Sequence, residues 1–166
     1  SIDKILSHQG QQICVLASGD PQCYGIGVTL LRHIPIDEMT IIPAPSTFSL
    51  ACARLGWSLS AVETLSLCGR PPAILQAYLY PGAKLLILSE GKRTPGTVSE
   101  ILTQRGFGQS SMTVLEHLGG GQERLVSGLA LTWAETDLAE LNTIAVECIA
   151  EPGTIVRPRT PGLPDD

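Results

Sequence analysis

The sequence predicts an α/β protein, because short apolar runs typical of buried strands alternate with helical patterns along most of the chain. The first run, Ile13–Ala17, ends at the tight turn Ser-Gly-Asp-Pro of residues 18–21, and an apolar helix flanked by glycines follows it. Open α/β sheets bind small molecules where a strand passes through such a turn into a helix. Residues 18–21 are therefore the first candidate site.

The predicted elements divide into two lobes. Strands are assigned to runs rich in Val, Ile, Leu and Thr, and helices to runs with apolar side chains three or four residues apart that start near Ser, Thr or Pro. In the first lobe, residues 1–60, we expect a short helix capped by Ser1 or Asp3, strands at 13–17 and 39–43, and helices at 24–33 and 47–55, the last ended by Gly56. In the second lobe, residues 61–150, we expect strands at 64–67, 84–89, 112–115, 124–127 and 143–149, and helices at 72–80, 98–105 and 129–138. Two lobes that meet near residues 57–62 would form a cleft.

Residues 151–166 predict an extended linker. They contain four prolines, at positions 152, 158, 161 and 164, and no periodic apolar pattern. The chain also starts without Met and enters directly on a helical pattern. We therefore expect further polypeptide on both sides of this sequence.

Composition and charge exclude two classes of partner. The chain has 166 residues, of which 43% are hydrophobic and 16% charged. Its apolar runs are shorter than the ~18 residues that a membrane span needs, so we do not expect the chain to cross or bind a membrane. A formal net charge of −5 with scattered Lys and Arg residues argues against nucleic acid.

The cysteines and histidines suggest neither a disulfide framework nor a metal site. The five cysteines stand at irregular spacing with no C-x-x-C motif and no signal peptide, which favours reduced thiols in a cytoplasmic protein. The three histidines lie far apart, so no metal is expected. The G-x-S-x-G elbow of serine hydrolases and the G-x-x-x-x-G-K-[ST] phosphate loop are both missing from the sequence.

Further residues can contact a ligand near the first turn. Gly25 and Gly27 do not match the dinucleotide-binding fingerprint, because Leu30 stands where its third glycine is expected. We interpret them as positions where the helix comes close to the sheet or to a ligand. Ser46 or Thr47 can cap helix 47–55, and the free amides of a helix start also bind carboxylates. Capping alone explains these hydroxyls equally well, and it also explains Asp20.

Three segments together resemble the tetrapyrrole (corrin/porphyrin) methylase family. They are residues 17–27 (Ala-Ser-Gly-Asp-Pro-Gln-Cys-Tyr-Gly-Ile-Gly), 43–57 (which starts Pro-Ala-Pro-Ser-Thr and ends Leu-Gly-Trp) and 65–71 (Leu-Ser-Leu-Cys-Gly-Arg-Pro). The likeness covers almost the whole chain. It is strongest to the amino-terminal half of fused precorrin methyltransferases of cobalamin biosynthesis. It implies a two-lobed fold with S-adenosylmethionine bound in the cleft between the lobes.

The resemblance assigns cofactor contacts to both lobes. It implies that residues 18–20 lie along the methionine and ribose of the cofactor, that the residue at 68 lies beside the adenine, and that the residue at 118 contributes a backbone contact. The matching positions are Ser18, Gly19, Asp20, Cys23, Ser46, Thr47, Cys68 and Leu118.

The reaction that the resemblance implies is methylation of carbon 5 of a precorrin-6Y type macrocycle. Its electron-rich carbon attacks the sulfonium methyl group in line, so catalysis is mostly positioning. No catalytic residue is assigned, because Glu116 and Glu123 fit structural pairing as well as proton removal. Cations that follow strand ends could bind the carboxylates of this substrate, although each also fits a solvated surface role. These candidates are Arg70, Lys92, Arg93 and Arg124.

The sequence departs from the family pattern at its start. The family begins with a strand and a G-x-G-P-G loop, which are missing here. We therefore expect an incomplete amino-terminal lobe with an unpaired strand edge and exposed apolar surface, and a fragment that is weak or inactive alone. The linker resembles the junction to a second methyltransferase domain. Whether the chain forms a homodimer is left open by the sequence.

Two alternatives to this function also stay open. One is a non-catalytic α/β fragment that binds a cofactor or a partner. The other is a methylase of the same family with a different substrate, such as uroporphyrinogen or the diphthamide precursor.

Overall fold

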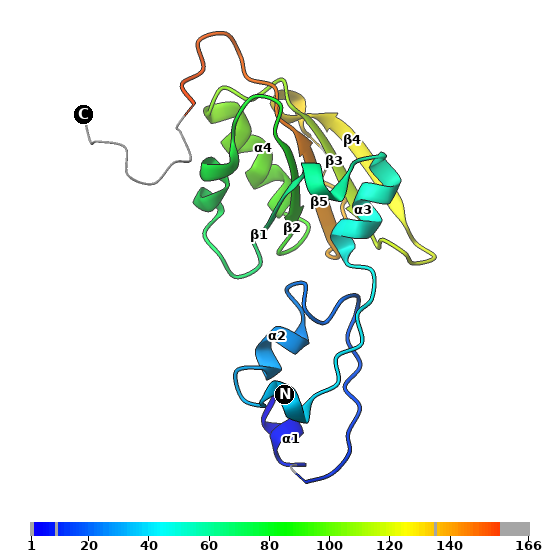
Figure 1. Ribbon diagram of the computed structural model, residues 1–166. Helices are drawn as coiled ribbons and strands as arrows, with labels where there is room; N and C mark the ends of the chain where they lie inside the picture. Colours follow the sequence, from blue (N-terminus) through cyan, green and yellow to red (C-terminus); the bar gives the residue numbers. More distant parts are fainter. Residues whose placement is uncertain (1, 9, 135, 157–166) are drawn as a thin grey trace, which may run out of the picture. The chain divides into compact units, whose positions relative to one another are not determined.

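The computed structural model describes residues 2–8, 10–134 and 136–156, which form two compact units (Figure 1). The amino-terminal unit runs to Thr47 and the carboxyl-terminal unit begins at Phe48. None of the helices in the described part of the chain combines the length and the apolar character needed to cross a membrane.

The described part of the amino-terminal unit contains short helices and no strand. Its elements are α1 (Ile2–Leu6), α2 (Ile26–Leu30) and the 3-10 turn η1 (Ile36–Glu38). The expected helix 24–33 is present but shorter, because Tyr24 has a φ of +55° and Pro35 disfavours helical backbone at the residue before it. Of the two expected caps of α1, Ser1 lies outside the described residues and Asp3 lies within the helix.

The predicted strands Ile13–Ala17 and Met39–Pro43 are wrong, because neither segment joins a sheet. A strand needs a hydrogen-bonded neighbour, and the described part of this unit supplies none. Both segments keep their apolar side chains partly in solvent, with Leu16 92% and Ile42 77% exposed. Together they line an open apolar cavity of about 450 Å³.

The carboxyl-terminal unit is built on a five-stranded mixed sheet (Figure 1). Its strands are β1 (Glu63–Ser66), β2 (Lys84–Leu88), β3 (Ser111–Glu116), β4 (Arg124–Leu129) and β5 (Asn142–Glu147). Their spatial order is β1-β2-β5-β3-β4, in which only β1 and β2 pair in parallel. All strands predicted for residues 61–150 are confirmed, with ends displaced by no more than two residues.

The helices of this unit follow the predictions less closely. α3 (Thr47–Leu55) has the predicted bounds, and Gly56 ends it with a φ of +67°. α4 (Thr94–Gln104) begins before the predicted start at Val98, and Pro95 occupies its first turn. η2 (Leu59–Ala61) is a short 3-10 turn ahead of β1.

Two predicted helices are wrong in kind or extent. The crossover at 72–80 is the 3-10 helix η3 (Pro72–Tyr78). Over the described part of 129–138, only η4 (Ala130–Thr132) is helical. Leu129 pairs with Ser111 in the sheet, so the hydrogen bonds of that strand pair replace the first turn of the expected helix.

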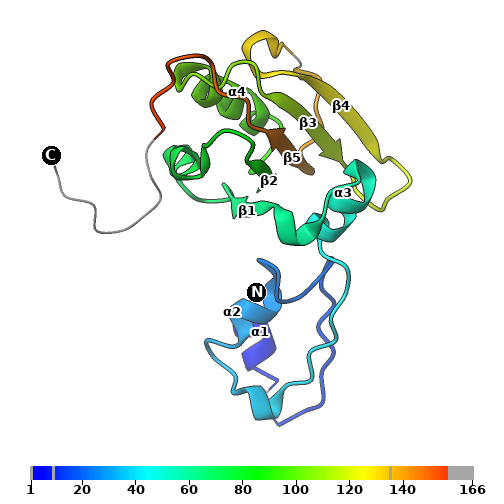
Figure 2. The ribbon, with the colours of Figure 1, turned by 45° about the horizontal axis from the view of Figure 1, so that its top comes forward.

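Helices cover both faces of the sheet (Figure 2). α4 and η3 close the main core, whose largest buried side chains are Leu65, Leu67, Leu75, Leu85, Ile87, Val98, Leu102, Phe107, Met112 and Ile144. α3 lies on the side of the sheet away from α4 (Figure 2), and on that face Leu86, Leu115 and Ala145 are buried. The sheet is therefore a layer between helices.

Truncation of the core side chain Leu102 should destabilise the carboxyl-terminal unit. Leu102 of α4 is fully buried, so Leu102→Ala leaves a cavity and should lower the free energy of unfolding by about 2–5 kcal/mol. Urea unfolding followed by the fluorescence of Trp57 and Trp133 measures this loss. Leu125→Ala, at a residue 44% exposed, is the control and should cost less than about 1 kcal/mol. Equal losses in the two variants would contradict the assigned core.

Candidate functional site

One edge of the sheet gathers the candidate residues of the carboxyl-terminal unit. The strand register aligns Ser66 of β1 with Leu88 of β2, and Leu88 with Thr143 of β5. Thr143 in turn aligns with Leu115 of β3, so the loops after β1, β2 and β3 all leave the sheet at this edge. On these loops, or at the start of β4, lie Cys68, Arg70, Lys92, Arg93, Leu118 and Arg124.

Cys68 stands exposed just past the end of β1. Its amide donates a hydrogen bond to Ser66 Oγ at 3.2 Å, and its thiol donates to the backbone oxygen of Ser89 at 3.0 Å. Gly69 follows with a φ of +63°, which turns the chain sharply. Because β1 and β2 are parallel, Cys68 lies at their carboxyl ends, where α/β proteins bind ligands.

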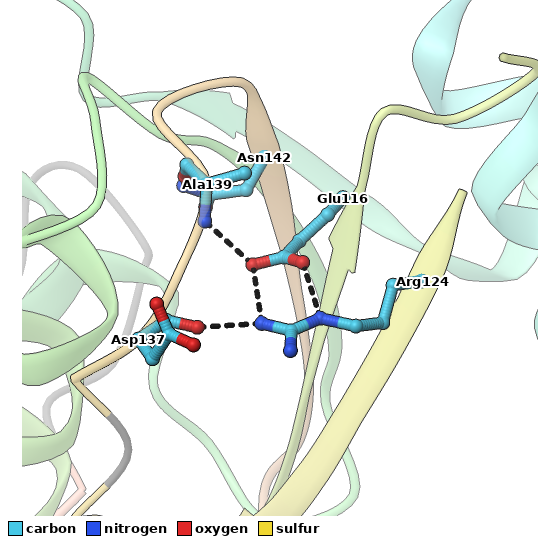
Figure 3. Close-up of polar contacts among 5 residues, drawn as sticks. All are labelled: Glu116, Arg124, Asp137, Ala139 and Asn142. Carbon is cyan, nitrogen blue, oxygen red and sulfur yellow. Dashed lines mark hydrogen bonds and ion pairs between the residues drawn. The ribbon is translucent and has the colours of Figure 1, made fainter. Parts of the chain in front are cut away.

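A buried carboxylate anchors the same edge (Figure 3). Glu116 is only 3% exposed and accepts hydrogen bonds from Arg124 Nε at 2.7 Å, from Arg124 Nη2 at 3.3 Å and from the amide of Ala139 at 2.6 Å. Arg124 Nη2 also donates to the backbone oxygen of Asp137 at 2.5 Å, and Asn142 Nδ2 donates to that of Ala139 at 2.8 Å. The ends of β3 and β4 are thereby tied to the segment that leads into β5.

The Glu116 carboxylate is a structural group rather than a proton acceptor. Its hydrogen bonds to Arg124 lower the pKa of Glu116 against the opposing effect of burial, and the Ala139 amide adds to the lowering. The carboxylate therefore stays ionised at neutral pH. Of the two roles that the sequence allowed for Glu116, structural pairing is the one supported by this geometry.

The glycine-rich loop between β3 and β4 is held by hydrogen bonds. The amide of His117 donates to Leu141 O at 3.1 Å, the amide of Gly120 donates to His117 O at 2.9 Å, and the amide of Gly119 donates to Glu123 Oε2 at 2.7 Å. A Cβ on Gly119 would lie 3.3 Å from Leu50 Cδ1 of α3. The loop therefore approaches α3 closely and presents Leu118 in a hydrogen-bonded segment.

The candidate cations differ in how their charges are used. Arg124 is paired with Glu116, and Lys92 contacts Glu140 through its amide at 3.2 Å and through Nζ at 3.6 Å. Arg93 is exposed at the cap of α4, and Arg70 is exposed after β1. The proposed role of each in substrate binding stays a prediction.

In the amino-terminal unit, the turn at residues 18–21 lies beside the segment that leads into Ser46. Gly19 has a φ of +70°, and a Cβ there would lie 3.6 Å from the backbone oxygen of Pro45. Asp20 Oδ1 accepts a hydrogen bond from the amide of Gln22 at 2.7 Å. Asp20 therefore caps its own turn. It does not cap α2, whose N-cap residue is Gly25.

The two glycines at the start of α2 are required by close packing. A Cβ on Gly25 would lie 2.6 Å from Pro21 O, and one on Gly27 would lie 2.8 Å from the same atom. Both glycines therefore pack against the backbone of the turn at residues 18–21. Among the described residues, the amides of Ser18 and Gly19 donate no hydrogen bond, so this turn offers backbone donors to a ligand.

The cysteines are free thiols in this structure, and burial raises the pKa of the Cys148 thiol to about 12. Within the described ranges, no group of three or more His, Cys, Asp or Glu side chains is arranged to hold a metal ion. Sequence reasoning did not single out Arg54, Ala139 or Asn142, although all contact residues at the sheet edge. Their partners are distant in sequence or are backbone atoms, so no motif could reveal them.

Comparison with known proteins identifies relatives along nearly the whole chain. The profile of the Tetrapyrrole (Corrin/Porphyrin) Methylases matches residues 2–132. The precorrin-6Y C(5,15)-methyltransferase [decarboxylating] of Sinorhizobium sp is 41% identical over 99% of this chain, which spans 40% of the length of that relative. The cobalt-precorrin-7 C(5)-methyltransferase of Salmonella typhimurium is 32% identical over 73% of this chain and 59% of its own length.

A solved structure supports the same fold. The uroporphyrin-III C-methyl transferase of Thermus thermophilus, complexed with S-adenosylhomocysteine, superposes with a TM-score of 0.57 at 18% identity. The match covers 78% of this chain and 62% of that chain.

Removal of the Glu116 carboxylate should destabilise the protein in a pH-dependent way. Glu116→Leu leaves Arg124 and the Ala139 amide without their buried partner and should cost about 3–5 kcal/mol at pH 7. Because the pKa of Glu116 is lowered in the folded state, the difference from the parent chain should be complete above the unfolded pKa. It should shrink as the pH falls through the folded pKa. Urea unfolding at several pH values measures it, and a difference independent of pH would contradict the assigned charge.

Proposed function

Because the chain belongs to the tetrapyrrole (corrin/porphyrin) methylase family, we propose that it methylates carbon 5 of a precorrin-6Y type macrocycle in cobalamin biosynthesis, with S-adenosylmethionine as methyl donor. The names of the Sinorhizobium and Salmonella relatives share carbon 5 as a site of methylation. Carbon 15 occurs only in the name of the relative of which this chain spans 40%. The shared position therefore favours carbon 5 for this part of the protein.

The observation that carries the proposal is the common edge of the sheet. It brings Cys68 and Leu118, which are distant in sequence, to the carboxyl ends of β1 and β3. Cys68 is exposed just after the buried residues 65–67, so a ligand beside it meets the thiol and backbone atoms together. Such a surface suits a heterocycle like adenine.

The turn at residues 18–21 fits the polar end of the same cofactor. The amides of Ser18 and Gly19 are available as donors, and the carboxylate of Asp20 stands in a turn that it caps itself. Amides of this kind can bind the carboxylate of the methionine moiety, and Asp20 can accept hydrogen bonds from ribose hydroxyls. Cys23, Ser46 and Thr47 complete the proposed set.

S-adenosylmethionine, when bound, supplies an electrophilic methyl group on a sulfonium. The chain's part in the reaction is then to bind the macrocycle, orient its carbon 5 and exclude water. No side chain is proposed as the catalytic base, because Glu116 and Glu123 are both paired with arginines. Arg70, Lys92, Arg93 and Arg124 remain the proposed ligands of the substrate carboxylates, and Arg93 is favoured over Lys92 and Arg124, which already contact glutamates.

We also propose that a further strand completes the amino-terminal lobe. The segments 13–17 and 39–43 are apolar and unpaired, and both line the 450 Å³ cavity of this unit. A strand inserted there would hydrogen-bond to both segments and cover the exposed Leu16 and Ile42. Residues 151–166 are proposed to join this lobed region to a second methyltransferase domain, in line with the greater length of the Sinorhizobium relative.

A binding and turnover experiment tests the proposed function. The chain should bind S-adenosylhomocysteine in a calorimetric titration, and an upstream-extended chain should transfer a labelled methyl group from S-adenosylmethionine to a precorrin-6Y type substrate. Gly19→Ala should weaken binding about tenfold, because a side chain at φ +70° costs about 1–2 kcal/mol and shifts the donor amides.

Gly10→Ala is the matched control. Gly10 also has a positive φ, of +86°, but has open space around it and lies outside the proposed site. Its substitution should leave the affinity unchanged. Binding without methyl transfer would favour the non-catalytic alternative, transfer to uroporphyrinogen would favour a different substrate, and no binding by the upstream-extended chain would contradict the proposal.

Extension of the chain upstream should strengthen cofactor binding. A strand that pairs with segments 13–17 and 39–43 would fix the turn at residues 18–21, so the extended chain should bind S-adenosylhomocysteine on the order of tenfold more tightly. Parallel titrations of both chains measure the difference. Equal affinities would contradict the proposed completion of the lobe.

A further inference from the structure

The loop between β3 and β4 carries a second ion pair, in which one arginine binds both oxygens of a carboxylate. Arg54 of α3 donates through Nε to Glu123 Oε1 and through Nη2 to Glu123 Oε2, the latter at 3.1 Å. The same Oε2 accepts the Gly119 amide at 2.7 Å. The Arg54 side chain is 41% exposed and that of Glu123 19%, and exposed pairs contribute little to stability.

A second contact joins the same loop to the same helix. Gly119 has a φ of +78°, and a Cβ there would lie 3.3 Å from Leu50 Cδ1. Leu50 and Arg54 are four residues apart, so they lie on one face of α3. The loop therefore approaches α3 closely at Leu50 and is bonded to it by the ion pair at Arg54, one turn further along the helix.

This double attachment matters because of the composition of the loop. Three consecutive glycines, Gly119–Gly121, would sample many backbone conformations if nothing held them. The Glu123 carboxylate restrains the first of them directly. Leu118 precedes that glycine, so its backbone is held in one position relative to α3.

We propose that Arg54 and Glu123 are positioning residues for S-adenosylmethionine, which hold the Leu118 backbone against the helix that begins at Thr47. The inference rests on the proposed function, from which it takes Leu118 and Thr47 as cofactor contacts. Arg54 and Glu123 act through the loop and are not catalytic residues. The ion pair connects the loop that carries Leu118 to the helix that begins at Thr47, and both residues are proposed cofactor contacts.

The charge state of the pair suits this role. The hydrogen bond from Arg54 lowers the pKa of Glu123, and the Gly119 amide lowers it further. The hydrogen bond to Glu123 raises the pKa of Arg54. Both groups therefore stay charged at the neutral pH of a binding assay.

Substitution of either partner tests the proposal. Arg54→Met and Glu123→Gln should each weaken binding of S-adenosylhomocysteine by calorimetry on the order of tenfold. The double variant should lose no more than either single variant, because the two residues act as one unit. Arg54→Lys keeps the charge without the paired hydrogen bonds and should be intermediate. Hydrogen exchange at the Gly119 amide should become faster in Arg54→Met and Glu123→Gln.

The control is Glu147→Gln, which breaks the exposed Lys84–Glu147 pair, 3.8 Å long, at the opposite end of the sheet. It should change neither affinity nor exchange at Gly119, while its thermal midpoint should match those of the test variants. Unchanged affinity in Arg54→Met alongside tight binding by the parent chain would overturn the positioning role alone. The variants are therefore made in the upstream-extended chain, and failure of that parent chain to bind would overturn the proposed function, and this inference with it.

Discussion

Glu116 lies at the last register position of β3, where a carboxylate that is 3% exposed requires a cationic partner. Arg124, directly opposite on β4, supplies it, and the Ala139 amide takes a further lone pair. The pair closes the β3–β4 hairpin and joins it to the segment entering β5. The loop that carries Leu118 begins one residue later, so its starting point is fixed by this buried ion pair. The position of Leu118 on the edge depends on that anchor.

The sheet of the carboxyl-terminal unit could be predicted from sequence because each strand finds its partner within the chain. The run Lys84–Leu88 is apolar, and neighbours on both sides satisfy its backbone. The run Ile13–Ala17 is just as apolar, yet no neighbour pairs with it in the described structure. Local pattern reports a tendency to be extended, whereas pairing is a tertiary property. Leu129 shows the same limit, because pairing with Ser111 overrides its helical pattern.

The candidate site was predictable only in part. The turn at residues 18–21 follows from local chemistry, since Gly19 adopts a positive φ and Asp20 caps the turn. That Cys68 and Leu118 share one edge follows from strand order, which composition does not encode. The role of Arg54 depends on Glu123, a partner 69 residues away. Such contacts become visible only when the chain is folded.

Cofactor contacts are proposed both for the turn at residues 18–21 and for the sheet edge that carries Cys68 and Leu118. A crystal structure of the upstream-extended chain with S-adenosylhomocysteine tests these contacts most directly. We expect the amino-acid moiety to contact the Ser18 and Gly19 amides, the adenine to lie beside Cys68 and the backbone of Leu118 to contact the ligand. A ligand bound away from these residues would contradict the proposed contacts.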